Sequence, residues 1–105
     1  MAVQDELQVW LDTDANMGQT MVVPYVKSVQ AMDMHFNMEV LQTGPAGSSR
    51  INQRGRVHVD ADRAVPLAWL TLGSRKEGEC KVEVSLSQGG KQLGVYRFDC
   101  SQHAS

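Results

Sequence analysis

The sequence lacks a long hydrophobic run, and it has no strong excess of charge of either sign. No stretch approaches the roughly 20 consecutive apolar residues of a membrane-spanning helix. Residues 1–6, MAVQDE, have neither a basic start nor an apolar core, so they do not form a signal peptide. If the protein is exported, we expect this chain to be the mature form with an added start methionine. A formal net charge of −2 gives no general attraction for nucleic acids or membranes.

The residues that carry most enzyme and metal chemistry are also scarce. The two cysteines, Cys80 and Cys100, are too far apart for a paired-cysteine zinc or thiol-redox motif, and the histidines are scattered at His35, His58 and His103. The sequence contains no phosphate-binding glycine loop and no nucleophile elbow. The neighbouring carboxylates near residue 12 are explained by a solvated turn. We therefore expect neither an enzyme nor a bound metal or cofactor.

What the sequence does contain is alternation with a period of two, which is typical of half-buried strands. The predicted strands cover residues 7–11, 21–27, 32–40, 50–59 and 65–72, followed by two strands before and after residues 89–91. We expect a turn at residues 14–18, a long loop at 43–49, a polar connection at 73–78 and a strand broken at Gly55. Pro24 predicts an edge position or a bulge in its strand.

These strands predict an all-β fold, an immunoglobulin/fibronectin-like two-sheet β-sandwich of about seven strands. A small barrel is the structural alternative. The 105 residues fit one domain, which we place at residues 6–101, with short flexible termini at residues 1–5 and 102–105. We expect the large aromatics Trp10 and Trp69 to pack in the core rather than to mark a binding groove. The six methionines are also expected to fill the core.

The register of the last two strands follows from the identity of their residues. If Gly89-Gly90-Lys91 is the hairpin loop, one register makes a bridgeable cysteine pair, two apolar pairs and two opposite-charge pairs. A slip by one residue would lose all of these pairs. They are Cys80–Cys100, Val82–Phe98, Val84–Tyr96, Lys81–Asp99 and Glu83–Arg97. Opposed positions on a hairpin favour a structural disulfide over two reduced thiols, and a disulfide indicates an oxidising compartment.

One charged cluster has two interpretations. Arg50, Arg54 and Arg56 share a face of their strand if Gly55 introduces no bulge. Charges of this kind protect an edge strand from aggregation, and the same residue types also bind partners. The cluster therefore predicts either a protected edge or a client-binding surface.

The segment GPAGSSRINQRGRV at residues 44–57, followed by an apolar strand at 66–72, CKVEV at 80–84 and a closing hairpin, resembles a known family. Over residues 34–100 the chain is similar to the curli-system amyloid inhibitors of the CsgC/CsgH type, more closely to the CsgH branch. The Cys-x-Cys motif of the enterobacterial branch is missing here, so no redox role transfers to this chain.

The resemblance implies a periplasmic sandwich that keeps curli amyloid subunits from forming fibrils before export, without cofactor or catalysis. We expect a monomer that contacts its client transiently and binds neither nucleic acid nor membrane. Two alternatives on the same fold are an extracellular binding or adhesion module and a strand-exchanging, pilus-type chaperone.

Overall fold

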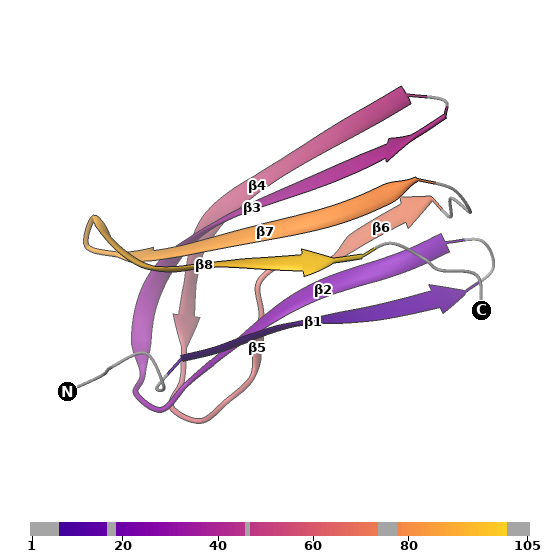
Figure 1. Ribbon diagram of the computed structural model, residues 1–105. Helices are drawn as coiled ribbons and strands as arrows, with labels where there is room; N and C mark the ends of the chain where they lie inside the picture. Colours follow the sequence, from indigo (N-terminus) through magenta and orange to yellow (C-terminus); the bar gives the residue numbers. More distant parts are fainter. Residues whose placement is uncertain (1–6, 17–18, 46, 74–77, 101–105) are drawn as a thin grey trace.

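The computed structural model describes residues 7–16, 19–45, 47–73 and 78–100. Every regular element in these residues is a β-strand, which confirms the predicted all-β class (Figure 1). The predicted flexible termini, residues 1–5 and 102–105, lie outside the described residues. The strands are β1 (Leu7–Asn16), β2 (Gln19–Ser28), β3 (Met32–Gly44), β4 (Gly47–Val59), β5 (Val65–Pro66), β6 (Leu70–Gly73), β7 (Glu79–Gln88) and β8 (Lys91–Asp99).

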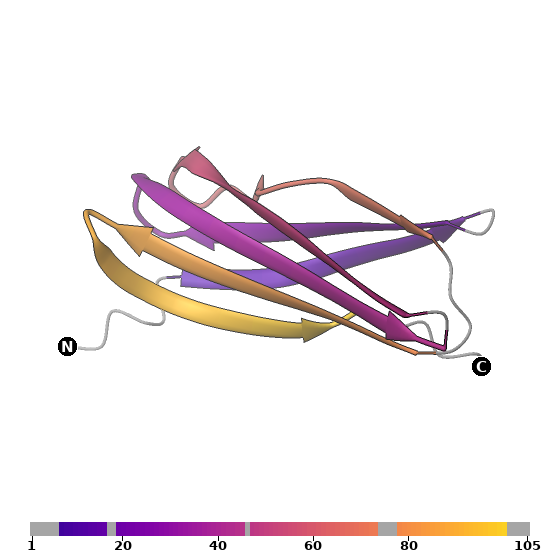
Figure 2. The ribbon, with the colours of Figure 1, turned by 90° about the horizontal axis from the view of Figure 1, so that it is seen from above.

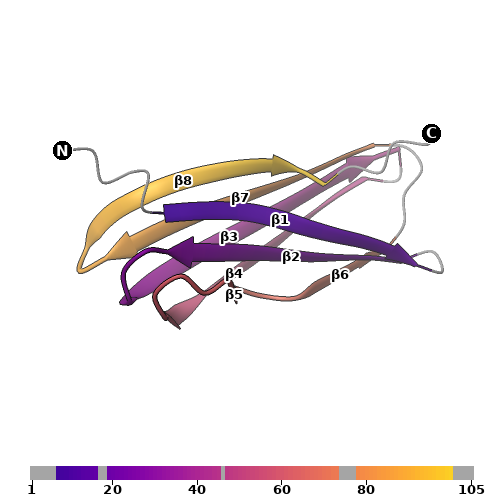
Figure 3. The ribbon, with the colours of Figure 1, turned by 90° about the horizontal axis from the view of Figure 1, so that it is seen from below.

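The strands form two antiparallel sheets that stack as two layers (Figures 2 and 3). One sheet has the order β1–β2–β5, with β6 also paired to β2, and the other has the order β4–β3–β7–β8. Because β5 and β6 together complete one edge, the eight segments correspond to a seven-strand plan. The predicted two-sheet sandwich is therefore confirmed. β4 joins the sheet of β3, whereas in a constant-type immunoglobulin domain the fourth strand belongs to the opposite sheet.

A single hydrophobic core lies between the two sheets. Alternate residues of each strand point inward, as the period of two predicts. Val22 and Val26 of β2 meet Val82 and Val84 of β7 in one buried cluster. Two of the methionines, Met34 and Met38, are fully buried there, as expected. This core fixes which side chains of every strand face the solvent.

The predicted register of the final hairpin is confirmed from Lys81–Asp99 through Val84–Tyr96. The predicted three-residue loop is wrong, because Lys91 pairs with Gln88 and only two glycines form the turn. Their φ angles of 58° and 80° fit a two-residue turn with both central residues left-handed. A register shift between Leu86 and Ser87 adds one residue to β8, and this bulge restores the predicted pairing further along.

The cysteine pair at the end of this hairpin forms the predicted disulfide. Cys80 and Cys100 have Cα atoms 4.9 Å apart, within the range that a disulfide spans without moving the backbone. The N–H of Cys100 donates to the carbonyl oxygen of Cys80 over 2.8 Å. Both side chains are buried at the margin of the core.

The hairpin of β3 and β4 is longer and more regular than the sequence predicts. The expected loop at residues 43–49 is wrong, since β3 runs to Gly44 and β4 begins at Gly47. The expected break at Gly55 is also wrong, because the two strands pair over thirteen positions without a register shift. The ring of Phe36 lies against Gly55, and an aromatic neighbour of this kind supports a glycine within a sheet.

Pro24 lies in the middle strand of its sheet, which corrects the expected edge position or bulge. A strand residue directs its N–H and C=O toward the same neighbour, and the Pro24 oxygen accepts a 2.8 Å bond from the N–H of Leu67. The missing N–H of Pro24 therefore faces the gap between β5 and β6. The run predicted at residues 65–72 is accordingly two short strands rather than one.

The first hairpin also extends further than expected. Asp14 and Asn16, expected in a turn, pair with Met21 and Gln19 inside the β1–β2 ladder.

In the described part of the chain, no helix is long and apolar enough to span a membrane.

Candidate functional site

The outward face of β4 carries the three arginines that the sequence singles out. The β3–β4 register has no shift at Gly55, so Arg50, Arg54 and Arg56 share this face, and all three are exposed. Asn52 lies between the first two. We call these three side chains the arginine row.

β4 is an edge strand of its sheet (Figure 1). From Gly47 to His58 its described residues are exposed or half-buried, and only Val59 is buried. Among the described residues, no side-chain hydrogen bond or ion pair engages the arginine row. Each guanidinium has five N–H donors, so the row presents a set of donors at the surface that a partner could use.

The arginine row borders a shallow depression on the outer face of the sheet. Arg54 and Arg56 line it together with His35 and Asn37 of β3, and Gly55 contributes to its lining. Its volume is about 700 Å³. The surface beside the row thus offers imidazole and amide groups, next to the apolar ring of Phe36.

A second depression of about 490 Å³ lies toward β8 and has a different charge pattern. Glu39 of β3 lies opposite Glu83 of β7, and Arg97 of β8 lies opposite Glu83 on the other side. Arg97 Nε donates to Glu83 Oε2 over 2.8 Å. Lys81, the other cation that lines this depression, lies 3.8 Å from Glu79 Oε2 through its Nζ. Both cations here are therefore paired, whereas the arginine row has no ion-pair partner among the residues that the structure describes.

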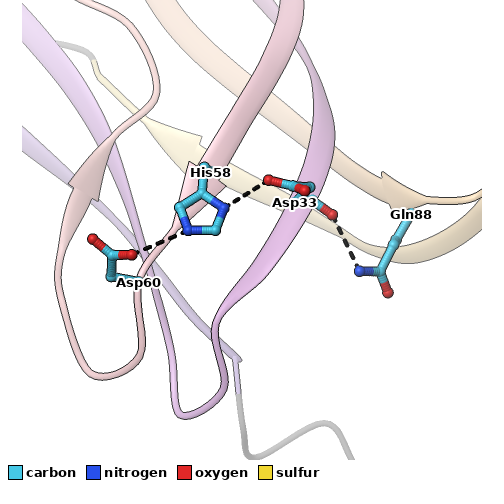
Figure 4. Close-up of polar contacts among 4 residues, drawn as sticks. All are labelled: Asp33, His58, Asp60 and Gln88. Atoms are coloured by element: carbon cyan, nitrogen blue, oxygen red, sulfur yellow. Dashed lines mark hydrogen bonds and ion pairs between the residues drawn. The ribbon is translucent and has the colours of Figure 1, made fainter.

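At one end of the arginine row, His58 is held between two carboxylates (Figure 4). Its Nδ1 lies 2.7 Å from Asp33 Oδ1, and its Nε2 lies 3.1 Å from Asp60 Oδ1. Gln88 Nε2 donates to the backbone oxygen of Asp33 over 3.1 Å, which links β7 to this cluster. The hydrogen bond to Asp33 is the main cause that raises the pKa of His58 above its ordinary value, with a smaller contribution from Asp60.

Both ring nitrogens of His58 are thus engaged by carboxylates, one on β3 and one just after β4. Within the described residues, no group of three or more His, Cys, Asp or Glu side chains is arranged to hold a metal ion. The hydrogen bonds of this cluster connect the start of β3 to the ends of β4 and β7 on the surface.

The opposite outer face, on the β1–β2 sheet, carries aromatic side chains that the sequence analysis placed in the core. That expectation is wrong: Trp69 is 63% exposed, and the half-buried Trp10 stacks on Tyr25 with ring centroids 5.6 Å apart. Met21 on the same face is 45% exposed, so the expectation that the methionines fill the core is wrong at this position. The sequence of β1 could have predicted the outward position of Trp10, because its neighbours Val9 and Leu11 face the core and side chains alternate along a strand.

Comparison with known proteins now assigns the family. The family model described as thin aggregative fimbriae synthesis protein, Tafi-CsgC, matches residues 2–95. The chain belongs to the Tafi-CsgC family. Comparison with curated protein sequences finds no match.

Two solved structures share the fold. The solution structure of R. palustris CsgH matches with a TM-score of 0.75 and 19% identity, over 89% of this chain and 91% of that one. The structure of "E. coli curli protein CsgC" matches with a TM-score of 0.75 and 19% identity, over 88% of this chain and 97% of that one. At this identity the likeness shows the fold, and the family match supports a curli-related role.

Membership of the Tafi-CsgC family confirms the resemblance predicted from the sequence. The Cys80–Cys100 disulfide agrees with an oxidising compartment. The assignment of the arginine row to client binding stays a prediction, and the fold supplies its position: an exposed row on an edge strand.

Proposed function

We propose that this protein binds curli amyloid subunits transiently in the periplasm and keeps them from forming fibrils before export. Family membership and the disulfide support the system and the compartment. The observation that carries the proposal is the arginine row on the exposed edge strand β4, which has no side-chain partner in the described part of the chain. The role is one of binding, without catalysis.

The physical basis is competition for the groups that build an amyloid. Fibrils grow by adding strands to open edges and by stacking ladders of polar side chains such as asparagine and glutamine. The arginine row offers guanidinium donors to carboxylate and amide oxygens of an extended client. Exposed charge contacts of this kind contribute only about 0.2–1 kcal/mol each, so the contact is short-lived and weakens with salt.

The test is the fibrillation of a purified curli subunit, followed by dye fluorescence, with substoichiometric amounts of this protein. We expect the wild type to lengthen the lag phase and the variant Arg50→Ser/Arg54→Ser/Arg56→Ser to lose most of this effect. The control variant, Lys27→Ser/Arg63→Ser/Lys91→Ser, removes three positive charges elsewhere and also takes the formal net charge from −2 to −5. Equal loss in both variants would show that inhibition depends on the net charge and not on the position of the arginine row.

Gel filtration separates this function from the two alternatives on the same fold. A strand-exchanging chaperone forms a stable, stoichiometric complex with its subunit, whereas a transient inhibitor elutes by itself. An adhesion module leaves the lag phase unchanged. Either of these outcomes would sink the proposed function.

A further inference from the structure

The direction of the backbone groups of β4 can be followed from one hydrogen bond at the far side of the sheet. The Cys80 carbonyl accepts from the N–H of Cys100, so Cys80 directs its backbone groups toward β8. Along a strand, N–H and C=O groups point to the two neighbours in alternation. The even-numbered residues of β7 therefore face β8, and the odd-numbered residues, such as Glu83, face β3.

The same alternation carries the argument across β3 to β4. Glu83 pairs with Glu39, so the odd-numbered residues of β3 face β7 and the even-numbered residues face β4. Met38, an even-numbered residue, pairs with Gln53. The odd-numbered residues of β4 thus bond to β3. The even-numbered residues direct their N–H and C=O groups away from the sheet, at the open edge.

The two hairpins of this sheet agree with that assignment. In a two-residue hairpin the flanking residues form a hydrogen-bonded pair. These pairs are Gln88–Lys91 for β7–β8 and Gly44–Gly47 for β3–β4. Gln88 is an even-numbered residue of β7 that faces β8, and Gly44 is an even-numbered residue of β3 that faces β4. Both agree with the directions derived from the Cys80–Cys100 hydrogen bond.

The open-edge backbone groups of β4 therefore belong to the residues of the arginine row and to Asn52 between them. The same four residues also point their side chains to the outer face. An extended segment that paired with this edge would receive backbone hydrogen bonds and guanidinium contacts from the same positions. Its side chains on that face would lie beside Arg50, Asn52, Arg54 and Arg56 in register.

β4 lacks the devices that protect two of the other three edges of the described sandwich. The third, β1, also pairs over ten positions without a shift, but its charged residues Asp12 and Asp14 are acidic. The edge formed by β5 and β6 is interrupted opposite Pro24, and β8 contains a bulge near Leu93. β4 pairs without a bulge over thirteen positions and contains no proline. Its only protection is charge, and charge selects a partner of opposite or hydrogen-bond-accepting character.

We propose that the open edge of β4 receives one extended client segment as an added strand, whose residues beside the arginine row are acidic or amide side chains. This inference rests on the proposed function and specifies its contact. The guanidinium groups would then lie along one face of the captured strand. A second sheet could not pack there as a dry zipper, because such interfaces require low charge.

The experiment uses a labelled peptide as long as residues 50–58, in which glutamine and glutamate alternate with threonine. Asn52→Pro removes one open-edge N–H and leaves the β3-facing groups of Ile51 and Gln53 in place, a substitution that edge strands tolerate. Val95→Pro is the matched control, since the same alternation places its N–H on the open edge of β8. Circular dichroism and the intact disulfide verify that both variants fold.

We expect Asn52→Pro to weaken peptide binding about fivefold or more, the loss from one net backbone hydrogen bond, and Val95→Pro to change it less than about twofold. In amide hydrogen exchange, saturating peptide should slow the amides of Asn52 and Arg54. The amides of Ile51 and Gln53 should be slow with or without peptide. Equal affinity for the two proline variants, or protection that appears on β1 or β8 instead, would overturn edge pairing.

The fibrillation assay separates this inference from the proposed function. If wild-type protein delays the curli subunit and Asn52→Pro delays it equally, edge pairing is wrong and the inhibitory function stands. If the peptide pairs with β4 but wild-type protein does not delay the subunit, the proposed function is wrong and the edge remains a strand-binding site.

Discussion

The ring of Phe36 lies so close to Gly55 on the neighbouring strand that a Cβ at position 55 would come within 3.3 Å of Phe36 Cε1. The two residues are paired in the β3–β4 ladder. The ring thus covers Gly55, the one glycine in the interior of β4, and the strand pairs there without a register shift, with Arg54 and Arg56 on either side.

Removal of this ring should weaken the edge strand. We expect Phe36→Ala to lower the free energy of unfolding by about 2–3 kcal/mol, less than for a fully buried phenylalanine because the ring is only partly buried. Gly55→Ala should cost stability in the wild type, where the methyl group displaces the ring, and gain stability in the Phe36→Ala background. Urea unfolding of the double-mutant cycle measures this coupling at about 0.5–1 kcal/mol. Additive effects would show that the ring does not support Gly55.

The disulfide should contribute strongly to stability. Its cysteines are 20 residues apart, and closing a loop of that length contributes about 3 kcal/mol in the chain-entropy description. We expect Cys80→Ala/Cys100→Ala to lose about that amount in guanidinium unfolding. Reductant should destabilise the wild type similarly and leave the double variant unaffected. A loss below about 1 kcal/mol would mean that the sheet is held by packing alone.

The histidine between two carboxylates should give a pH dependence of defined sign. The pKa of His58 is raised in the folded protein, chiefly by the hydrogen bond to Asp33. Its contribution is therefore complete below the pKa of the unfolded chain and is lost as pH rises through the folded pKa. The stability difference between wild type and His58→Gln should vanish over that interval.

Proton NMR titration of the His58 ring provides the direct check. We expect its midpoint above 6.5, with a larger downward change in Asp33→Asn than in Asp60→Asn, since the Asp33 contact is the dominant cause. An unchanged midpoint in Asp33→Asn would contradict the assigned contact.

The exposed tryptophan should be dispensable for folding. Trp69 is 63% exposed, so Trp69→Ser should change the free energy of unfolding by less than about 1 kcal/mol. Val84 is fully buried, and Val84→Ala should cost about 2–3 kcal/mol in the same assay. Acrylamide should quench wild-type fluorescence more strongly than that of Trp69→Ser, where the stacked Trp10 remains. A large loss for Trp69→Ser would mean that its ring supports the sheet.

Local pairing rules predicted the last hairpin well because they act on many residues at once. Apolar, charged and cysteine pairs all require the same offset between Val82 and Phe98, so one register satisfies them together. The turn was misjudged by one residue, since a bulge in β8 compensates for the shorter turn. A bulge of this kind leaves no composition signal that distinguishes it from a longer loop.

Elsewhere the sequence failed where a neighbour determines the conformation. Gly55 lies in a continuous strand because of the ring on β3, and Pro24 lies in a central strand because its neighbours are interrupted opposite it. Both facts belong to the tertiary structure. Trp10 illustrates a different failure, because hydrophobicity alone was taken to imply burial although alternation along β1 decides which face its side chain occupies.

The sequence predicted that the three arginines of the row share one face, because all three are even-numbered residues of a strand without a bulge. The place of the row on an outer edge could not be predicted, because strand order depends on which strands pair across the sheet. That order is also what leaves the backbone groups of Asn52 unpaired within the sheet.

Every strand from β1 to β8 precedes Cys100 in the chain, so the covalent bond can close only after the whole sandwich has been synthesised. Until the disulfide forms, non-covalent pairing and packing alone hold β8 against β7. The bond is thus the last covalent constraint that the described domain can acquire.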